Sequence, residues 1–143
     1  MKLSFSTFLF LLAGSFLYSQ TTLTIEIANI RNPQKGNILI AVFKNKDHFT
    51  NDNSFKKIIA SKEQFINGIL KKSIRLPSGV YGIAILDDED NDKEMSYNFL
   101  GIPKEGYGYS NYFPVGFKKP IFSDIKFSIS ESINFISIKL RYL

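Results

Sequence analysis

Apolar residues alternate with polar residues along several short stretches of this chain. In TLTIEIA, Leu23, Ile25 and Ile27 occupy every second position, and polar residues lie between them. Ile136 and Ile138 begin a similar pattern near the C-terminus. Because successive side chains of a β-strand point to opposite faces, a period of two predicts strands with one buried face.

Turn residues separate these stretches. Asn32-Pro33-Gln34-Lys35-Gly36 follows the first strand and precedes NILIAVF at 37–43, so we expect these two strands to form a hairpin. The region 46–60 lacks alternation and predicts one short helix or ordered loop, on which Phe49, Phe55, Ile58 and Ile59 line one face. Further strands are expected at 69–76, 80–86, 125–129 and 136–142.

Short strands without a long helical repeat predict an all-β fold. We expect an antiparallel β-sandwich, immunoglobulin-like or prealbumin-like, of about seven strands, with a small barrel as the alternative. No internal repeat or linker divides residues 21–143, so a single domain is predicted.

The N-terminus has the layout of a secretory signal. Lys2 is followed by an apolar run from Phe5 to Leu17, which is short for a bilayer span. We predict a signal peptide over 1–20, cleaved after Ser19 or Gln20, with an uncleaved anchor as the alternative. The chain contains no cysteine, which excludes a lipoprotein anchor and favours a bacterial envelope protein over a disulfide-built secreted domain. We therefore expect an exported protein, periplasmic or extracellular, without a membrane span after cleavage.

The formal charge of +5 comes from scattered lysines, including the pairs Lys56-Lys57, Lys71-Lys72 and Lys118-Lys119. No basic block or basic helical stripe accompanies them, so no nucleic-acid partner is predicted. Lysines of this kind keep a surface soluble and strand edges unpaired.

An acidic stretch, DDEDND at 87–92, follows the strand expected at 80–86. Asp88, Asp90 and Asp92 have the spacing of positions one, three and five of a calcium loop. Position six is Lys93 instead of glycine, and position twelve is Phe99 instead of glutamate, which excludes a complete EF-hand.

A shorter calcium loop remains open, in which Glu94 contributes a main-chain carbonyl and Ser96 a hydroxyl or a bridging water. Crowded carboxylates repel one another, and a bound divalent cation would relieve that repulsion. The alternative is a solvated turn without a metal. Calcium is the only cofactor that the sequence suggests.

A glycine- and tyrosine-rich run follows at 106–113. Tyr107, Tyr109 and Tyr112 are candidates for a ligand surface, because aromatic faces stack on sugar rings and contact protein partners. The alternative is that these rings pack against the sandwich as core or rim.

Catalytic motifs are scarce. His48 is the only histidine, no cysteine is present, and no Gly-x-Ser-x-Gly elbow surrounds any serine. A carboxylate pair for glycoside hydrolysis could in principle be drawn from Asp88, Glu94 or Glu105. We therefore predict a protein that is not an enzyme.

Three strings carry a resemblance to a known family: LPSGVYGIAILDDED, NFLGIPKEGYGYSN and KKPIFSDIKFSI. They resemble the exported bacterial proteins grouped as domain-of-unknown-function family 2141, and the resemblance runs from Leu23 to Tyr142. It implies a β-sandwich of the envelope or extracellular space, and no established activity. In that family the acidic loop usually has a glycine where Lys93 stands and an aspartate where Ser96 stands.

The sequence thus predicts an exported β-sandwich, a non-catalytic binding or accessory domain of the bacterial cell envelope with a weak calcium site. Its partner would be a protein or glycan of the envelope. The alternatives are a structural envelope protein without a specific ligand and a carboxylate-based hydrolase.

Overall fold

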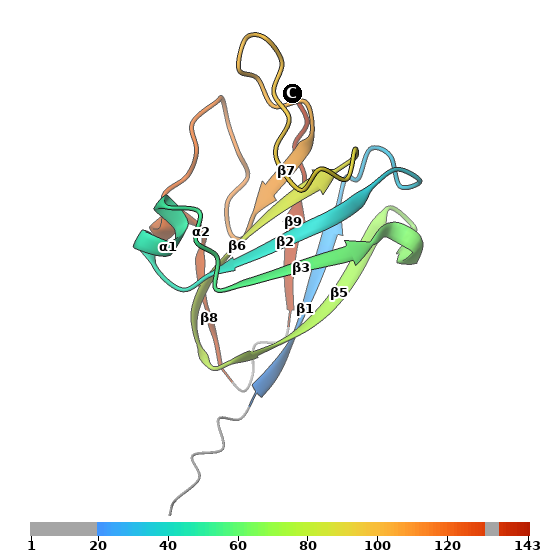
Figure 1. The fold of residues 1–143 in the computed structure, drawn as a ribbon. Coiled ribbons are helices and arrows are strands. Elements are labelled where there is room, and N and C mark those ends of the chain that lie inside the picture. The colour runs from blue at the N-terminus through green and yellow to red at the C-terminus, as the bar shows by residue number, and fades with distance from the viewer. Residues whose placement is uncertain (1–19, 131–134) are drawn as a thin grey trace, which may run out of the picture.

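The computed structural model describes residues 20–130 and 135–143, which form two facing β-sheets (Figure 1). One sheet has the order β4 (Phe65–Ile66), β5 (Ile69–Pro77), β1 (Gln20–Ala28), β9 (Phe135–Lys139). The other has the order β3 (Lys56–Ser61), β2 (Asn37–Phe43), β6 (Gly79–Asp88), β7 (Gly106–Tyr109), and β8 (Lys126–Ile129) also pairs with β6. The predicted all-β sandwich is confirmed. Except for Gln20, the predicted signal peptide lies outside the described residues.

The described residues also contain three short helices. Helix α1 (Lys46–Thr50) begins where the Asn45 side chain accepts a hydrogen bond from the His48 N–H at 2.9 Å. A 3-10 turn, η1 (Lys62–Gln64), follows β3, and helix α2 (Phe122–Ile125) precedes β8. In Figure 1, α1 and α2 lie together at one edge of the five-stranded sheet.

The core between the sheets is built by the alternation seen in the sequence. In β1, Leu23, Ile25 and Ile27 are fully buried, and in β9 Ile136 and Ile138 are buried. The two strands pair in parallel, whereas the remaining strand pairs are antiparallel. The pattern therefore predicts which side chains face inward, but not which strands become neighbours.

The expected hairpin of the first two strands is wrong. β1 pairs with β5 and β9, and β2 pairs with β3 and β6, so the two lie in different sheets. The connection 29–36 crosses from one sheet to the other, beginning at Asn29 with a left-handed φ of 67°. Both strands have an apolar inner face, and crossing the sandwich lets both faces enter one core.

Part of the region expected as helix or loop is a strand. The helix covers only Lys46–Thr50, and β3 pairs with β2 as an edge strand. Ile58 and Ala60 face the core while Ile59 is exposed. Because Ile58 and Ile59 are both apolar, the sequence does not show this alternation of inward and outward positions. Ile125 likewise ends α2 instead of beginning a strand. With the two-residue β4, the described residues contain nine strands instead of about seven.

A second apolar cluster lies on the outer face of the five-stranded sheet. Phe43, Phe49 and Ile125 are its buried members. Phe49 comes from α1 and Ile125 from α2, so the two helices cover this part of the sheet. The partly buried residues that pack against it are Ala41, Ala84, Tyr109, Tyr112 and Phe122.

A buried ion pair lies at one end of the sandwich. The Lys62 ammonium contacts Asp87 Oδ1, and both side chains are almost completely shielded from solvent. The ammonium also donates to the backbone carbonyls of Asn32, at 3.1 Å, and Lys35. The Tyr142 hydroxyl donates to Asp87 Oδ2. Three separate segments therefore meet at the end of β6.

Breaking this ion pair should destabilise the protein strongly. Lys62→Met leaves the Asp87 carboxylate buried without its cation, and we expect a loss of about 3–5 kcal/mol in the free energy of unfolding. Lys71→Met is the matched control, because Lys71 is exposed and pairs with Glu26 on the surface, at 2.9 Å. Lys71→Met should lower the free energy of unfolding by no more than about 1 kcal/mol. Denaturant unfolding measures both; equal losses would contradict the role given to Lys62.

Candidate metal site

The acidic loop after β6 is folded by its own carboxylates. Asp88 Oδ1 accepts from the Asp92 N–H at 3.1 Å, and Asp88 Oδ2 accepts from the Lys93 N–H at 3.1 Å. Asn91 and Lys93 adopt left-handed φ angles of 62° and 67°. Lys93 thus takes the backbone conformation for which calcium loops use glycine, at some cost in strain.

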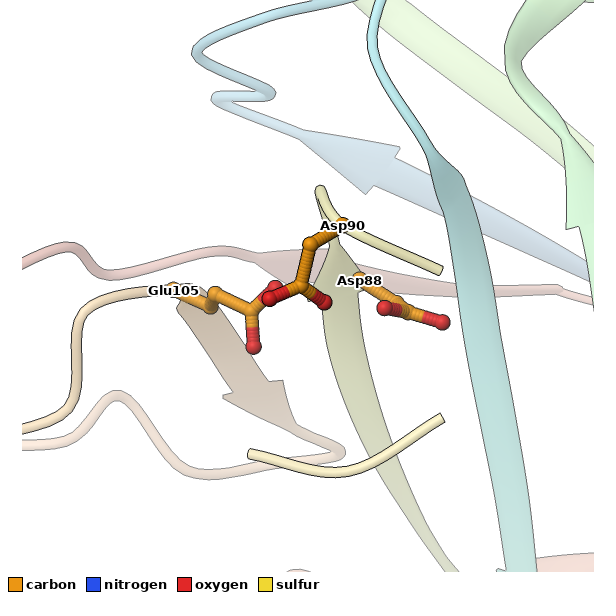
Figure 2. Close-up of side chains that lie close together, drawn as sticks. All are labelled: Asp88, Asp90 and Glu105. Carbon is orange, nitrogen blue, oxygen red and sulfur yellow. The ribbon is translucent and has the colours of Figure 1, made fainter. Parts of the chain in front are cut away.

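Three carboxylates meet at the base of this loop. Asp88, Asp90 and Glu105 each offer an oxygen, and the three oxygens lie within 4.8 Å of one another. Figure 2 shows the Asp90 carboxylate between those of Glu105 and Asp88. Asp88 and Glu105 are buried, whereas Asp90 is exposed. One side of the cluster therefore faces solvent.

Strand register brings Glu105 to this position. β6 and β7 are antiparallel, with Asp87 opposite Gly106. The residue after Asp87 and the residue before Gly106 are therefore neighbours across the same ladder. Extending this register by one residue puts Asp88 opposite Glu105, which lies directly before β7.

Glu105 also holds both ends of the acidic loop. Its Oε1 accepts from the Glu89 N–H at 2.9 Å, and its Oε2 accepts from the Ser96 N–H at 3.1 Å. The Ser96 hydroxyl donates to Asp90 Oδ2 at 3.2 Å. These bonds order the carboxylates before any ligand is present. Each ionised carboxylate has about four lone-pair positions, so acceptor capacity remains on all three.

The electrostatic environment differs among these acids. Burial raises the pKa of Asp88 and of Glu105, because the charged forms lose solvation. At Asp90 desolvation is the largest single influence and acts to raise the pKa, but the hydrogen bonds to its carboxylate, including those from Asp92 and Ser96, together outweigh it and lower the pKa. The two buried carboxylates therefore gain from a nearby cation.

The neighbouring Glu89 already has cationic and polar partners. Arg31 Nη2 contacts Glu89 Oε2 at 3.2 Å, and Asn32 Nδ2 donates to Glu89 Oε1 at 2.8 Å. Burial acts to raise the pKa of Glu89, but these hydrogen bonds prevail and lower it. Its charge is thus neutralised by protein groups, unlike that of the three clustered acids.

The structure brings together only some of the residues that the sequence suggested. Asp88 and Asp90 meet, and the Ser96 hydroxyl contacts Asp90. Asp92 Oδ1 accepts from the Glu94 N–H at 2.8 Å, and neither of these acids belongs to the cluster of three. Glu105 was considered only as a catalytic carboxylate. Its position just before a strand was visible in the sequence, but its partner strand and register were not.

The candidate ligand tyrosines lie on the outer face of the five-stranded sheet. The Tyr107 and Tyr109 ring centroids are 6.1 Å apart, and those of Tyr109 and Tyr112 are 6.4 Å apart. Tyr109 also packs edge-on against Phe49, at 6.2 Å. All three tyrosines are half-buried, so each combines packing with an exposed portion. Burial raises the pKa of Tyr109 to about 12.

Comparison with known proteins finds a family but no characterised relative. A family model described as an uncharacterized protein conserved in bacteria, DUF2141, matches residues 25–136. No curated protein and no solved structure matches the chain. Within the described residues, no helix is long and apolar enough to cross a membrane.

The raised pKa of Tyr109 predicts a loss of stability in alkali. An unfolded tyrosine loses its proton near pH 10, whereas folded Tyr109 keeps it until about pH 12, so unfolding is increasingly favoured as pH rises through this interval. By pH 12, the free energy of unfolding of the native protein should fall by up to about 2–3 kcal/mol relative to that of Tyr109→Phe. Denaturant unfolding at several pH values measures this.

The same comparison at pH 7 is the control for Tyr109→Phe, because the hydroxyl is protonated there in both the folded and unfolded states. A stability difference between the two proteins that stays constant from pH 7 to pH 12 would contradict the burial of this hydroxyl.

Proposed function

We propose a function on the premise that this chain belongs to the DUF2141 family of uncharacterised bacterial proteins: it is an exported, non-catalytic binding or accessory domain of the cell envelope with a weak calcium site. The observation that carries the calcium proposal is the convergence of Asp88, Asp90 and Glu105. Export is supported by the signal-like N-terminus, with its early lysine and short apolar run.

The spacing of the three oxygens suits calcium. Calcium–oxygen distances are about 2.3–2.6 Å, so two oxygens bound to one ion lie at most about 5 Å apart. Oxygens within 4.8 Å of one another satisfy that limit. Magnesium binds at about 2.0–2.1 Å and needs closer oxygens in a nearly octahedral arrangement, so calcium is the better match.

The proposed affinity is low because the protein supplies few ligands. Calcium takes six to eight oxygens, and three carboxylates provide only part of that number. Water would fill the remaining positions on the exposed side, beside Asp90. The carboxylates would also retain hydrogen bonds from backbone N–H groups, which already offset part of their charge.

A binding function is preferred to carboxylate-based hydrolysis. A hydrolase needs its acids beside a hollow that holds a substrate. Two hollows on the described surface are lined by other residues, and neither includes Asp88, Asp90 or Glu105. The first is lined by Pro33, Gln34, Gly36, Ser61, Lys62, Glu63 and Phe65, and the second by Lys44, Pro77, Ser78, Gly79, Val80 and Tyr81.

The exposed parts of Tyr107, Tyr109 and Tyr112 offer a second surface for binding. Tyrosine rings held by neighbouring rings lose little conformational entropy when they contact a partner. We therefore retain an envelope protein or glycan as the partner proposed for this surface.

Calcium should raise the melting temperature. At free calcium tenfold above its dissociation constant, the folded state gains about 1.4 kcal/mol, equivalent to about 3–6 °C for a domain of this size. Asp88→Asn and Glu105→Gln should each abolish the shift, because each removes a buried charged ligand. Thermal unfolding with calcium or with a chelator measures it.

Glu63→Gln is the control for these variants, because Glu63 is an exposed carboxylate on η1 outside the cluster. It should keep the full calcium response. A native protein whose melting temperature is the same in millimolar calcium and in chelator would refute the site.

One further variant, compared with Glu105→Gln, tests which acids hold the ion. The geometry predicts that Glu105→Gln removes the calcium response while Glu94→Gln preserves it, because only Glu105 belongs to the cluster. Calcium titration by calorimetry of both variants measures this. If Glu94→Gln removed the calcium response and Glu105→Gln preserved it, the ion would lie in the contiguous loop 88–96 without Glu105.

A further inference from the structure

Two loops beside β7 present apolar side chains to solvent. In the first loop, 97–102, Phe99 is 94% exposed and Leu100 is 67% exposed. In the second loop, 113–121, Val115 and Phe117 are each 76% exposed. Single exposed apolar residues are ordinary on a soluble protein, but two loops of this kind that flank the same strand indicate an interaction surface.

Hydrogen bonds order the tip of the first loop. Asn98 Oδ1 accepts from the N–H groups of Leu100, at 2.9 Å, and Ile102, at 3.0 Å. The Asn98 N–H donates to the Ile102 carbonyl at 2.9 Å, and Gly101 N–H donates to the Asn98 carbonyl at 3.0 Å. The backbone is thus held while Phe99 points away from the protein.

Arg141 orders the second loop. Its Nη1 donates to the carbonyls of Pro114, at 2.7 Å, and Gly116, at 2.9 Å. The Arg141 backbone exchanges two hydrogen bonds with Tyr107, at 3.0 and 2.8 Å. The second loop is therefore fastened beside β7, whose N-terminal end follows the first loop. Figure 1 shows the gold loop extending beyond the start of β7 and the orange loop running from the end of β7 to α2.

Apart from Glu105, the charged residues of the two loops and of the positions that flank them at 95–123 are lysines. The segments 95–104 and 106–123 contain no aspartate or glutamate, and they carry Lys104, Lys118 and Lys119. All three lysines are exposed. Glu105, which separates the segments, is buried and accepts hydrogen bonds from the N–H groups of Glu89 and Ser96.

We propose that these two loops dock the protein on the surface of an anionic lipid bilayer. Phe99, Leu100, Val115 and Phe117 enter the boundary between headgroups and acyl chains, and the lysines contact the anionic headgroups. Protein–protein interfaces are depleted in lysine, whereas lysine beside exposed apolar residues is typical of membrane-surface segments. This docking does not depend on calcium.

Phe99→Trp provides a direct reporter, because the chain contains no other tryptophan. The protein beginning at Gln20, which contains the whole described fold, is mixed with vesicles of phosphatidylcholine alone or with phosphatidylglycerol added, always in chelator. We expect a blue shift of the tryptophan emission, and co-sedimentation of the native protein, only with phosphatidylglycerol.

Substitutions at the loops should weaken this binding selectively. Phe99→Ser and Phe117→Ser should each reduce vesicle affinity at least about tenfold, the effect of exposing one phenylalanine to water. Phe135→Ser is the matched control, because Phe135 is 54% exposed on β9 in the other sheet. It should bind vesicles like the native protein.

Removal of charge gives a second matched pair. Lys118→Gln with Lys119→Gln should weaken binding about 30-fold, equivalent to about 1 kcal/mol per lysine. Lys56→Gln with Lys57→Gln makes the same change in net charge on β3 and should have little effect.

Three results would overturn the proposal. The first is the absence of both the emission shift and co-sedimentation. The second is equal weakening by the Lys56/Lys57 and Lys118/Lys119 variants, which would indicate attraction by net charge alone. The third is a native dimer that Phe99→Ser dissociates in analytical ultracentrifugation, because the loops would then join two copies. None of these results bears on the calcium site, since every measurement is made in chelator.

Discussion

The buried contact among Lys62, Asp87 and Tyr142 sets the orientation of the end of β6. Asp87 can face the interior only because an ammonium and a hydroxyl satisfy its carboxylate there. Side chains alternate along a strand, so Asp88 must then face the opposite side, toward the acidic loop. The candidate metal site is thus positioned by an ion pair that contributes no residue to it. A Cβ at Gly106 would occupy the space of the Tyr142 ring, so the absence of a side chain there lets Tyr142 reach Asp87.

Two surfaces of opposite character lie next to each other in the chain beyond this end of β6. The loop 87–96 is rich in carboxylates, whereas the segments around β7 carry exposed apolar residues and, apart from Glu105, lysines as their charged residues. Hydrogen bonds between side chains and the backbone order both surfaces. A cation held by Asp88, Asp90 and Glu105 would also reduce the negative charge beside the basic loops. The two proposed binding events are therefore compatible on one protein, although docking does not require the cation.

Several features of the fold follow from local sequence alone. The period of two in β1 and β9 identifies the inward-facing residues, because burial of one face of a strand requires that pattern. The pattern fails at Ile58-Ile59, where both faces of an edge strand carry isoleucine and the sequence no longer distinguishes them. The residues near Ile125 are compatible with a helix or a strand. Packing of Ile125 against Phe43 and Phe49 favours the helix α2. The crossing of 29–36 between sheets depends on the common core and has no local signal.

The sequence by itself determined the all-β class, the inner faces of the regular strands and the acidic character of the loop after β6, because each depends on residues close together in the chain. Tertiary structure alone decided that Glu105 joins Asp88 and Asp90, that Asp92 and Glu94 stay outside their cluster, and that Arg141 fastens the loop 113–121. The register of β6 against β7 makes the first of these contacts, and the approach of the C-terminal segment to β7 makes the last. Strand register and sheet order are set by packing over the whole core, which no short stretch of sequence specifies.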